Sequence, residues 1–155
     1  MSASLEQRIQ QLEDQAAIKR VVDIFANLAD VKDIKSQMDL FTEDATVETY
    51  FGDTLFASMR GRDEISNVFS GFIANFSALY HMNGQFTVDI DGDKANSTHY
   101  CLVVLISEDA QGKTYKNLNG IIYQDEYARR DGQWLISKRV AHFTWRDMSD
   151  LVMPS

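Results

Sequence analysis

The chain has 155 residues, 45% of them hydrophobic and 11% aromatic, which is enough for one domain with a sizeable core and leaves little room for two. Fifteen basic residues against 23 acidic ones give a formal net charge of −8. This charge argues against nucleic acid or an anionic membrane surface as a partner, because both are negatively charged. The sequence therefore predicts a single domain over residues 1–155.

A long amphipathic helix is predicted over the first thirty residues, where charged side chains alternate with apolar ones at helical spacing. Ser4 and Gln7 offer a capping box at its start. This charged segment is unlike a secretory signal, and no apolar run approaches the roughly 20 residues that cross a bilayer. The single cysteine, Cys101, lies in an apolar run, so we expect a buried structural thiol in a reducing cytoplasm.

Two shorter helices and six strands follow. Helical spacing covers residues 34–41 and the segment from Gly61-Arg62-Asp63 to Phe76. Runs rich in β-branched and aromatic residues predict strands at 45–50, 55–59, 80–90, 95–106, 115–130 and 134–145. Turn residues separate them at positions 52–53, 91–93, 111–112 and 131–132.

Helices that precede a long meander predict an α+β fold, in which a curved antiparallel sheet wraps around the N-terminal helices as a cone. The open end of such a cone is a usual place for a small-molecule cavity. The later strands carry apolar residues at both parities, and three helices cannot cover both faces of the sheet. We therefore expect a homodimer that forms through the outer face of the sheet.

Arg139 occupies an unusual position in the last predicted strand. Strict alternation places it on one face with small and apolar residues, namely Leu135, Ser137, Ala141, Phe143 and Trp145. A guanidinium among such neighbours requires an anionic partner. The alternative is that this strand lies at a margin of the sheet and Arg139 reaches water.

His81 is the best of three histidines for a general base, because it opens the polar face of its predicted strand. The sequence does not say which face of that strand lines the cavity, and an exposed strand histidine is the alternative. Asp30 lies near the end of the first helix, where the helix dipole disfavours a carboxylate, so a nearby cation is expected to compensate. The alternative for Asp30 is a solvated acid in a charged turn.

Other chemistries lack the residues that they need. The histidines are widely separated and no carboxylate cluster has the spacing of metal ligands, so no metal is predicted. No glycine-rich loop could hold phosphates, so no nucleotide cofactor is implied. No serine lies in a glycine elbow, and Cys101 is in the middle of a strand, so a nucleophilic mechanism is not expected.

The chain resembles the SnoaL-like branch of the nuclear transport factor 2-like superfamily, which has a cystatin-like α+β cone, over nearly its whole length. The resemblance depends on the order and spacing of five motifs: DQAAIKRVVDIFANLAD (14–30), LFTEDATVE (40–48), GRDEI (61–65), YHMNGQFTVDIDGDKA (80–95) and DEYARRDGQWLISKR (125–139). Within the branch the pattern is most similar to hexachlorocyclohexane dehydrochlorinase and, more distantly, to scytalone dehydratase.

This resemblance implies a cavity His-Asp dyad that takes a proton from a ring substrate, at His81 and Asp30. It also implies that Arg139 pairs with Asp30 or assists the departure of an anion. Phe25 stands where the dehydrochlorinase has a lysine, which argues against halide elimination. Ala29 stands where scytalone dehydratase has a tyrosine, which argues against that dehydration. Substrate-binding side chains are expected at Phe25, Tyr50, Phe69, Phe72, Phe143 and Trp145.

The resulting hypothesis is a cofactor-free lyase or isomerase that acts on a small cyclic apolar molecule. The competing hypothesis is a noncatalytic ligand-binding or assembly module of the same fold, such as a dioxygenase small subunit. The position of the dyad discriminates between them. Contact between Asp30 and His81 inside a closed cavity favours catalysis, whereas separation on the surface favours the binding module.

Overall fold

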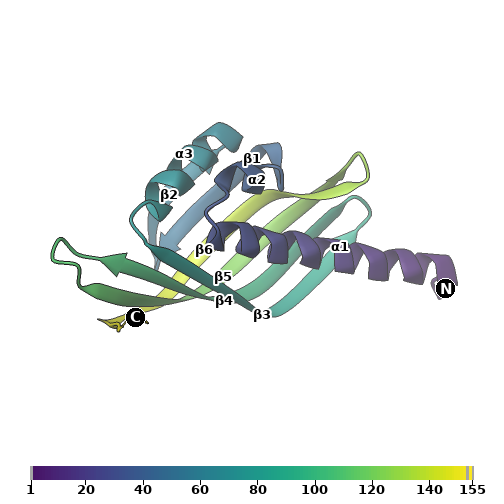
Figure 1. Ribbon diagram of the computed structural model, residues 1–155. Coiled ribbons are helices and arrows are strands. Elements are labelled where there is room, and N and C mark those ends of the chain that lie inside the picture. The colour runs from purple at the N-terminus through teal and green to yellow at the C-terminus, as the bar shows by residue number, and fades with distance from the viewer. Residues whose placement is uncertain (1, 153, 155) are drawn as a thin grey trace.

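A computed structural model of the chain, which describes residues 2–152 and 154, places three helices before most of a six-stranded sheet (Figure 1). The helices are α1 (Leu5–Asp30), α2 (Ile34–Met38) and α3 (Arg62–Ile73). The strands are β1 (Phe41–Phe51), β2 (Thr54–Arg60), β3 (Ala78–Asp91), β4 (Lys94–Glu108), β5 (Thr114–Arg130) and β6 (Gln133–Asp150). The predicted element order is confirmed, although α2 and α3 each end three residues earlier than the sequence suggested.

The sheet is mixed, with strand order β2-β1-β6-β5-β4-β3. Four of its five neighbouring pairs are antiparallel, but β1 and β6 are parallel. The α+β class and the curved sheet are therefore confirmed, whereas the expectation of a wholly antiparallel sheet is wrong for this pair. Turn residues identify strands that are neighbours in sequence. β1 and β6 are the first and last strands in the chain, so no turn motif in the sequence indicates that they pair.

Helix α1 crosses the sheet and packs mainly against β3, at one edge (Figure 1). The capping box predicted at Ser4 and Gln7 is present. The helix buries one stripe of side chains on the sheet: Ile18, Val21, Val22, Phe25, Ala26 and Ala29. Burial of this stripe fixes the rotation of α1 about its own axis. Its last residue, Asp30, therefore lies beside the start of β3.

A buried carboxylate fixes α1 further along its length. Asp14 accepts hydrogen bonds from Trp134 Nε1 at 3.1 Å and from Arg129 Nη1 at 2.5 Å. Burial alone would raise the pKa of Asp14, but hydrogen bonds from Trp134, Arg129 and Gln10 together lower it. The ionised carboxylate thus ties α1 to the β5–β6 hairpin, at the opposite end of the sheet from Asp30.

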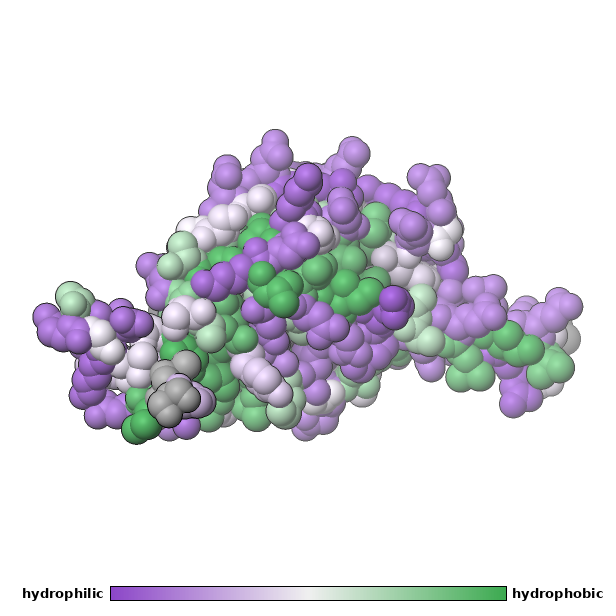
Figure 2. Space-filling view, viewed as in Figure 1, coloured by the Kyte–Doolittle hydropathy of each residue, from purple (hydrophilic) through white to green (hydrophobic). Residues whose placement is uncertain are grey.

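Beyond this contact, the first turns of α1 project past the sheet (Figures 1 and 2). Their apolar side chains Leu5, Ile9 and Leu12 are exposed, and they form the green stripe on the projecting arm in Figure 2. No helix among the described residues combines the length and the apolar character needed to span a membrane.

A β-bulge in β3 decides which of its side chains face inward. The register with β4 shifts between Asn83 and Phe86, so one extra residue is accommodated there. An extra residue reverses the alternation of faces beyond it. Leu79 and His81 therefore face inward before the bulge, and Phe86 packs on the core after it.

Two more bulges lie in β6. Ser137 is the extra residue where Lys138 pairs with Glu126 and Ile136 with Tyr127, and Thr144 is the extra residue near the end of the sheet. The inward face of β6 is therefore Trp134 and Ile136 before the first bulge, and Arg139, Ala141 and Phe143 after it. The strict alternation expected from the sequence is wrong at Leu135 and Ser137, because it does not count the extra residue.

Candidate active site

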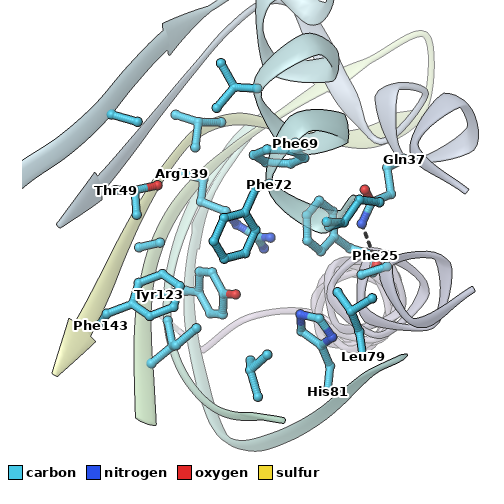
Figure 3. Close-up of a pocket in the computed structure, with 18 of the residues that line it drawn as sticks. Phe25, Gln37, Thr49, Phe69, Phe72, Leu79, His81, Tyr123, Arg139 and Phe143 are labelled. Atoms are coloured by element: carbon cyan, nitrogen blue, oxygen red, sulfur yellow. Dashed lines mark hydrogen bonds between the residues drawn. The ribbon is translucent and has the colours of Figure 1, made fainter. Parts of the chain in front are cut away.

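The concave face of the sheet, α1 and α3 enclose a cavity of about 130 Å³ that opens on one side (Figure 3). Nearly all of its lining is apolar or aromatic. The polar side chains in the lining are Gln37, Thr49, His81, Tyr123 and Arg139. Few polar groups in an otherwise apolar wall are characteristic of small-molecule sites, where the polar groups fix the orientation of the ligand.

His81 and Asp30 meet at this cavity. His81 Nδ1 lies 2.6 Å from Asp30 Oδ1, and the backbone N–H of His81 donates to Asp30 Oδ2 at 3.1 Å. One carboxylate therefore fixes both the backbone and the ring of His81. The side chains are 10% and 27% exposed respectively, so the pair is at the cavity and not on the open surface. A carboxylate at the C-terminus of a helix needs a group that compensates for the helix dipole. For Asp30 this group is His81, which contacts it through both the backbone N–H and the ring.

Arg139 also lines the cavity, but its partner is not Asp30. Its Nε and Nη2 donate to the two oxygens of Asp125 at 2.9 and 2.7 Å, and both side chains are almost fully buried. Burial alone would lower the pKa of Arg139, but the charge of Asp125 raises it, so the guanidinium stays charged. The prediction of a carboxylate partner is confirmed, whereas the prediction that this partner is Asp30 is wrong.

The guanidinium of Arg139 lies between two aromatic rings. Its central carbon is 4.2 Å from the ring centroid of Phe25 and 4.5 Å from that of Tyr123. On its other face Tyr123 stacks on His99, with ring centroids 4.8 Å apart. Burial lowers the pKa of His99 to about 4, so this imidazole is neutral at neutral pH. The Tyr123 ring is thereby held between a cation and a neutral ring.

A buried hydrogen-bond network supports the Asp125 carboxylate from behind. Tyr127 donates to Asp125 Oδ2 at 3.1 Å, and the Tyr127 hydroxyl is 2.7 Å from the hydroxyl of Ser97. Arg139 Nη1 is buried and has no hydrogen-bond partner among residues 2–152 and 154. The charge pair is therefore held rigidly, with one donor nitrogen left free.

Four of the six predicted substrate-binding residues line the cavity, namely Phe25, Phe69, Phe72 and Phe143 (Figure 3). Tyr50 does not, because Thr49 and Phe51 face the cavity and the alternation turns Tyr50 outward, where it stacks on His142. Trp145 does not either. The bulge at Thr144 turns it to the outer face, where it covers Gly120 so closely that any side chain at position 120 would collide with it.

Sequence reasoning missed three residues of the site. Tyr123 and Asp125 are two positions apart in β5 and face the same side of the sheet as Arg139. The spacing is visible in the sequence, but the pairing of Asp125 with Arg139 depends on the register of the hairpin. Gln37 is buried on α2, where its Nε2 donates to the carbonyl oxygen of Phe25 at 3.0 Å. A single glutamine in a five-residue helix carries no sequence signal of burial.

The described residues provide neither a cluster of metal ligands nor a reactive thiol. Within the described part of the chain, no three His, Cys, Asp or Glu side chains gather in a group that could hold a metal ion. Burial raises the pKa of Cys101 to about 11, so its thiol is protonated at neutral pH and fits the expected structural role. The absence of a cofactor remains a prediction.

Solved structures with the same architecture are similar to the chain throughout. Hexachlorocyclohexane dehydrochlorinase LinA-type3 from Novosphingobium barchaimii LL02 aligns with a TM-score of 0.77 at 18% identity, over 96% of this chain and 99% of that one. An NTF2-like protein with a cystatin-like fold from Novosphingobium aromaticivorans aligns with a TM-score of 0.71 at 21% identity, over 92% of each chain. At these identities the likeness shows the cystatin-like fold alone.

Sequence comparison gives the family. An uncharacterised protein of Mycobacterium tuberculosis (strain ATCC 25618 / H37Rv) is 26% identical over 133 residues, which cover 85% of this chain and 86% of that protein. The family model of the SnoaL-like domain matches residues 10–140, which include Asp30, His81 and Arg139 but not the cavity residue Phe143. The chain therefore belongs to the SnoaL-like domain family.

Proposed function

We propose that the protein is a cofactor-free lyase or isomerase in which His81 removes a carbon-bound proton from a small cyclic substrate. The observation that carries the proposal is the contact between His81 and Asp30 at the wall of a largely apolar cavity. This contact favours catalysis over a noncatalytic binding module, because binding an apolar ring does not require an oriented imidazole.

The hydrogen bond to Asp30 sets the tautomer of His81. An ionised carboxylate can only accept, so Nδ1 carries the proton and donates to Asp30 Oδ1. Nε2 is then the basic nitrogen, and the His81 ring lies in the cavity wall (Figure 3). When Nε2 takes a proton, the Asp30 carboxylate stabilises the imidazolium that forms.

Arg139 is proposed to stabilise the negative charge that develops on the substrate. Its charge is partly balanced by Asp125, so the site offers a donor without a large excess of positive charge. Phe25 covers one face of the guanidinium, at the position where a second cation would be needed for halide departure. The pair is thus better suited to an oxygen of the substrate than to a free anion.

The cavity limits the size of the substrate. A volume of about 130 Å³ is close to that of a closed apolar cavity that holds a single benzene ring. The ring would be surrounded by the aromatic side chains Phe25, Phe69, Phe72 and Phe143. A monocyclic molecule, such as a small terpenoid or an intermediate of aromatic degradation, therefore fits best.

The proposal predicts turnover of at least one small ring compound without any added metal or cofactor. Cyclic ketones, alcohols and halides would be incubated with the protein dialysed against a chelator. Mass spectrometry would detect loss of water or acid, and chromatography would detect isomers of unchanged mass. Tight binding of ring compounds with no conversion in any class would instead favour the binding module.

We further propose a homodimer that forms through the outer face of the sheet. Tyr80 and Met82 on β3 and Tyr100 and Leu102 on β4 are between 44% and 60% exposed, and Met82 pairs directly with Leu102. Trp145 on β6 extends this apolar surface. An exposed patch of this kind is unusual on a monomer and is removed by self-association.

Light scattering at micromolar concentration is expected to give twice the 17.7 kDa mass of one chain. Leu102→Glu should reduce the mass to that of one chain, because a carboxylate in an apolar interface is costly to desolvate. Leu55→Glu is the matched control, since Leu55 is 50% exposed on β2 at the opposite edge of the sheet. A wild-type mass of 17.7 kDa would contradict the dimer.

A further inference from the structure

The hydroxyl group of Tyr123 is a polar group of the cavity that no residue in the described part of the chain hydrogen-bonds. Figure 3 shows Tyr123 with its oxygen directed into the cavity, towards the side on which His81 lies. No hydrogen bond joins this oxygen to any other described residue, in contrast to Tyr127, whose hydroxyl meets Ser97 and Asp125. The Tyr123 oxygen is not among the fully buried polar atoms that lack a partner, so it is accessible from the cavity and its O–H can donate to a ligand there.

The surroundings of Tyr123 make this hydroxyl a fixed and effective donor. The ring is 8% exposed and is held between His99 and the guanidinium of Arg139, so it cannot swing away from the cavity. A cation against the ring face draws electron density from the phenol, which strengthens the O–H group as a donor. Burial raises the pKa of Tyr123 well above its ordinary value, so the proton stays on the oxygen.

We infer that Tyr123 binds the carbonyl oxygen of the substrate and that the substrate is a small cyclic ketone or enone. The inference rests on the proposed function, because it says where the substrate places its oxygen while His81 removes the proton. A neutral acceptor such as a carbonyl oxygen fits here better than a ligand carboxylate. Arg139 is already paired with Asp125, so the site has little net positive charge to offer an anion.

The chemistry that follows is enolate formation. His81 Nε2 takes the proton from the carbon next to the carbonyl, and the C–H electron pair becomes the C=C bond of the enolate. The π electrons of the carbonyl move to its oxygen, where the Tyr123 O–H donates a hydrogen bond and the guanidinium of Arg139 lies against the Tyr123 ring. The enolate then collapses by protonation at another carbon, which is isomerisation, or by expelling a leaving group from the β-carbon, which is elimination.

A pair of isosteric probes tests the oxygen site. Benzaldehyde and styrene differ in C=O against C=CH₂, and neither has an acidic proton next to a carbonyl, so binding is measured without reaction. Dissociation constants would be obtained by ligand-observed NMR for the wild type, Tyr123→Phe and the control Tyr80→Phe. Tyr80 is 60% exposed on the outer face, so that control removes the same atom outside the cavity.

Tyr123→Phe is expected to weaken the binding of benzaldehyde relative to that of styrene by about 2- to 12-fold, which corresponds to the roughly 0.5–1.5 kcal/mol that one hydrogen bond contributes. Tyr80→Phe should leave the ratio unchanged. The C=O stretching band of bound benzaldehyde should also lie at lower frequency in the wild type than in Tyr123→Phe. An unchanged ratio, or identical bands, would overturn the inference.

The same measurements in a His81→Ala background separate this inference from the proposed function. The benzaldehyde preference should persist there, since Tyr123 and Arg139 are untouched. If the preference is found but no ring compound is ever converted, the oxygen site stands and the proposed reaction fails. If conversion is found without the preference, only the assignment of Tyr123 fails.

Discussion

Replacing His81 with alanine is expected to lower the turnover of any substrate found for this protein by about 10²- to 10⁴-fold, the usual contribution of a general base. Binding of unreactive ring compounds should change little, because the aromatic lining of the cavity remains. The free energy of unfolding should fall by no more than about 1 kcal/mol, since Asp30 is 27% exposed and can be hydrated when the imidazole is gone.

His142→Ala is the matched control for that experiment. His142 lies on the outer face of β6, stacked on Tyr50, and is expected to have no effect on turnover. Asp30→Asn should lower turnover by a similar factor to His81→Ala, because its amide group can donate to Nδ1 and thereby favour the tautomer with a proton on Nε2. Equal turnover in His81→Ala and the wild type would remove His81 from the mechanism.

Replacing Arg139 with methionine is expected to destabilise the fold by about 3–5 kcal/mol, the usual cost of breaking a fully buried charge pair. The reason is that Asp125, whose side chain is 0% exposed, would keep a buried charge without its partner. Urea unfolding would measure the loss. The double variant Arg139→Met with Asp125→Asn should recover at least half of it, because neither residue then carries a charge.

A control comes from an exposed ion pair between β5 and β1. Arg130 Nη1 lies 3.3 Å from Asp44, with side chains 48% and 65% exposed, so Arg130→Met should change stability by less than about 1 kcal/mol. Similar losses in Arg130→Met and Arg139→Met, or a double variant no more stable than Arg139→Met alone, would show that Asp125 carries no buried charge.

Local sequence patterns predicted most of the secondary structure. The 3.6-residue spacing of apolar side chains placed α1 correctly, and Asp131-Gly132 identified the β5–β6 turn, where both residues have positive φ (51° and 77°). Each of these features depends on residues that are close together in the chain. The parallel pairing of β1 with β6 depends on distant segments, and no local pattern encodes it.

Two errors in the site, the partner of Arg139 and the place of Trp145, have one physical origin, which is the β-bulge. In a regular hairpin from the Asp131-Gly132 turn, Arg139 would stand opposite Gln124, and the extra residue Ser137 moves it opposite Asp125. The bulge at Thr144 likewise turned Trp145 away from the cavity. Alternation predicts which side chains share a face of the sheet only between bulges. The residue types at Ser137 and Thr144 do not indicate that either is an extra residue.

The His81 position was predicted better, because it depends on two local features. The stripe of α1 fixed where Asp30 emerges, and His81 lies near the start of β3, before the bulge that follows Asn83. The sequence does not show which face of β3 lines the cavity. Tyr80 and Met82 are apolar enough to form part of a core, yet they lie on the outer face of the sheet.

The cavity has a single imidazole in its wall, and this arrangement has a stereochemical consequence. The base lies on one side of the bound ring, and a ring that fills a cavity of about 130 Å³ displaces the water that could exchange the captured proton. A proton taken from one face of the ring can therefore be returned only to that same face. An isomerisation here would be suprafacial, and an isotopic label on the migrating hydrogen would be carried over into the product.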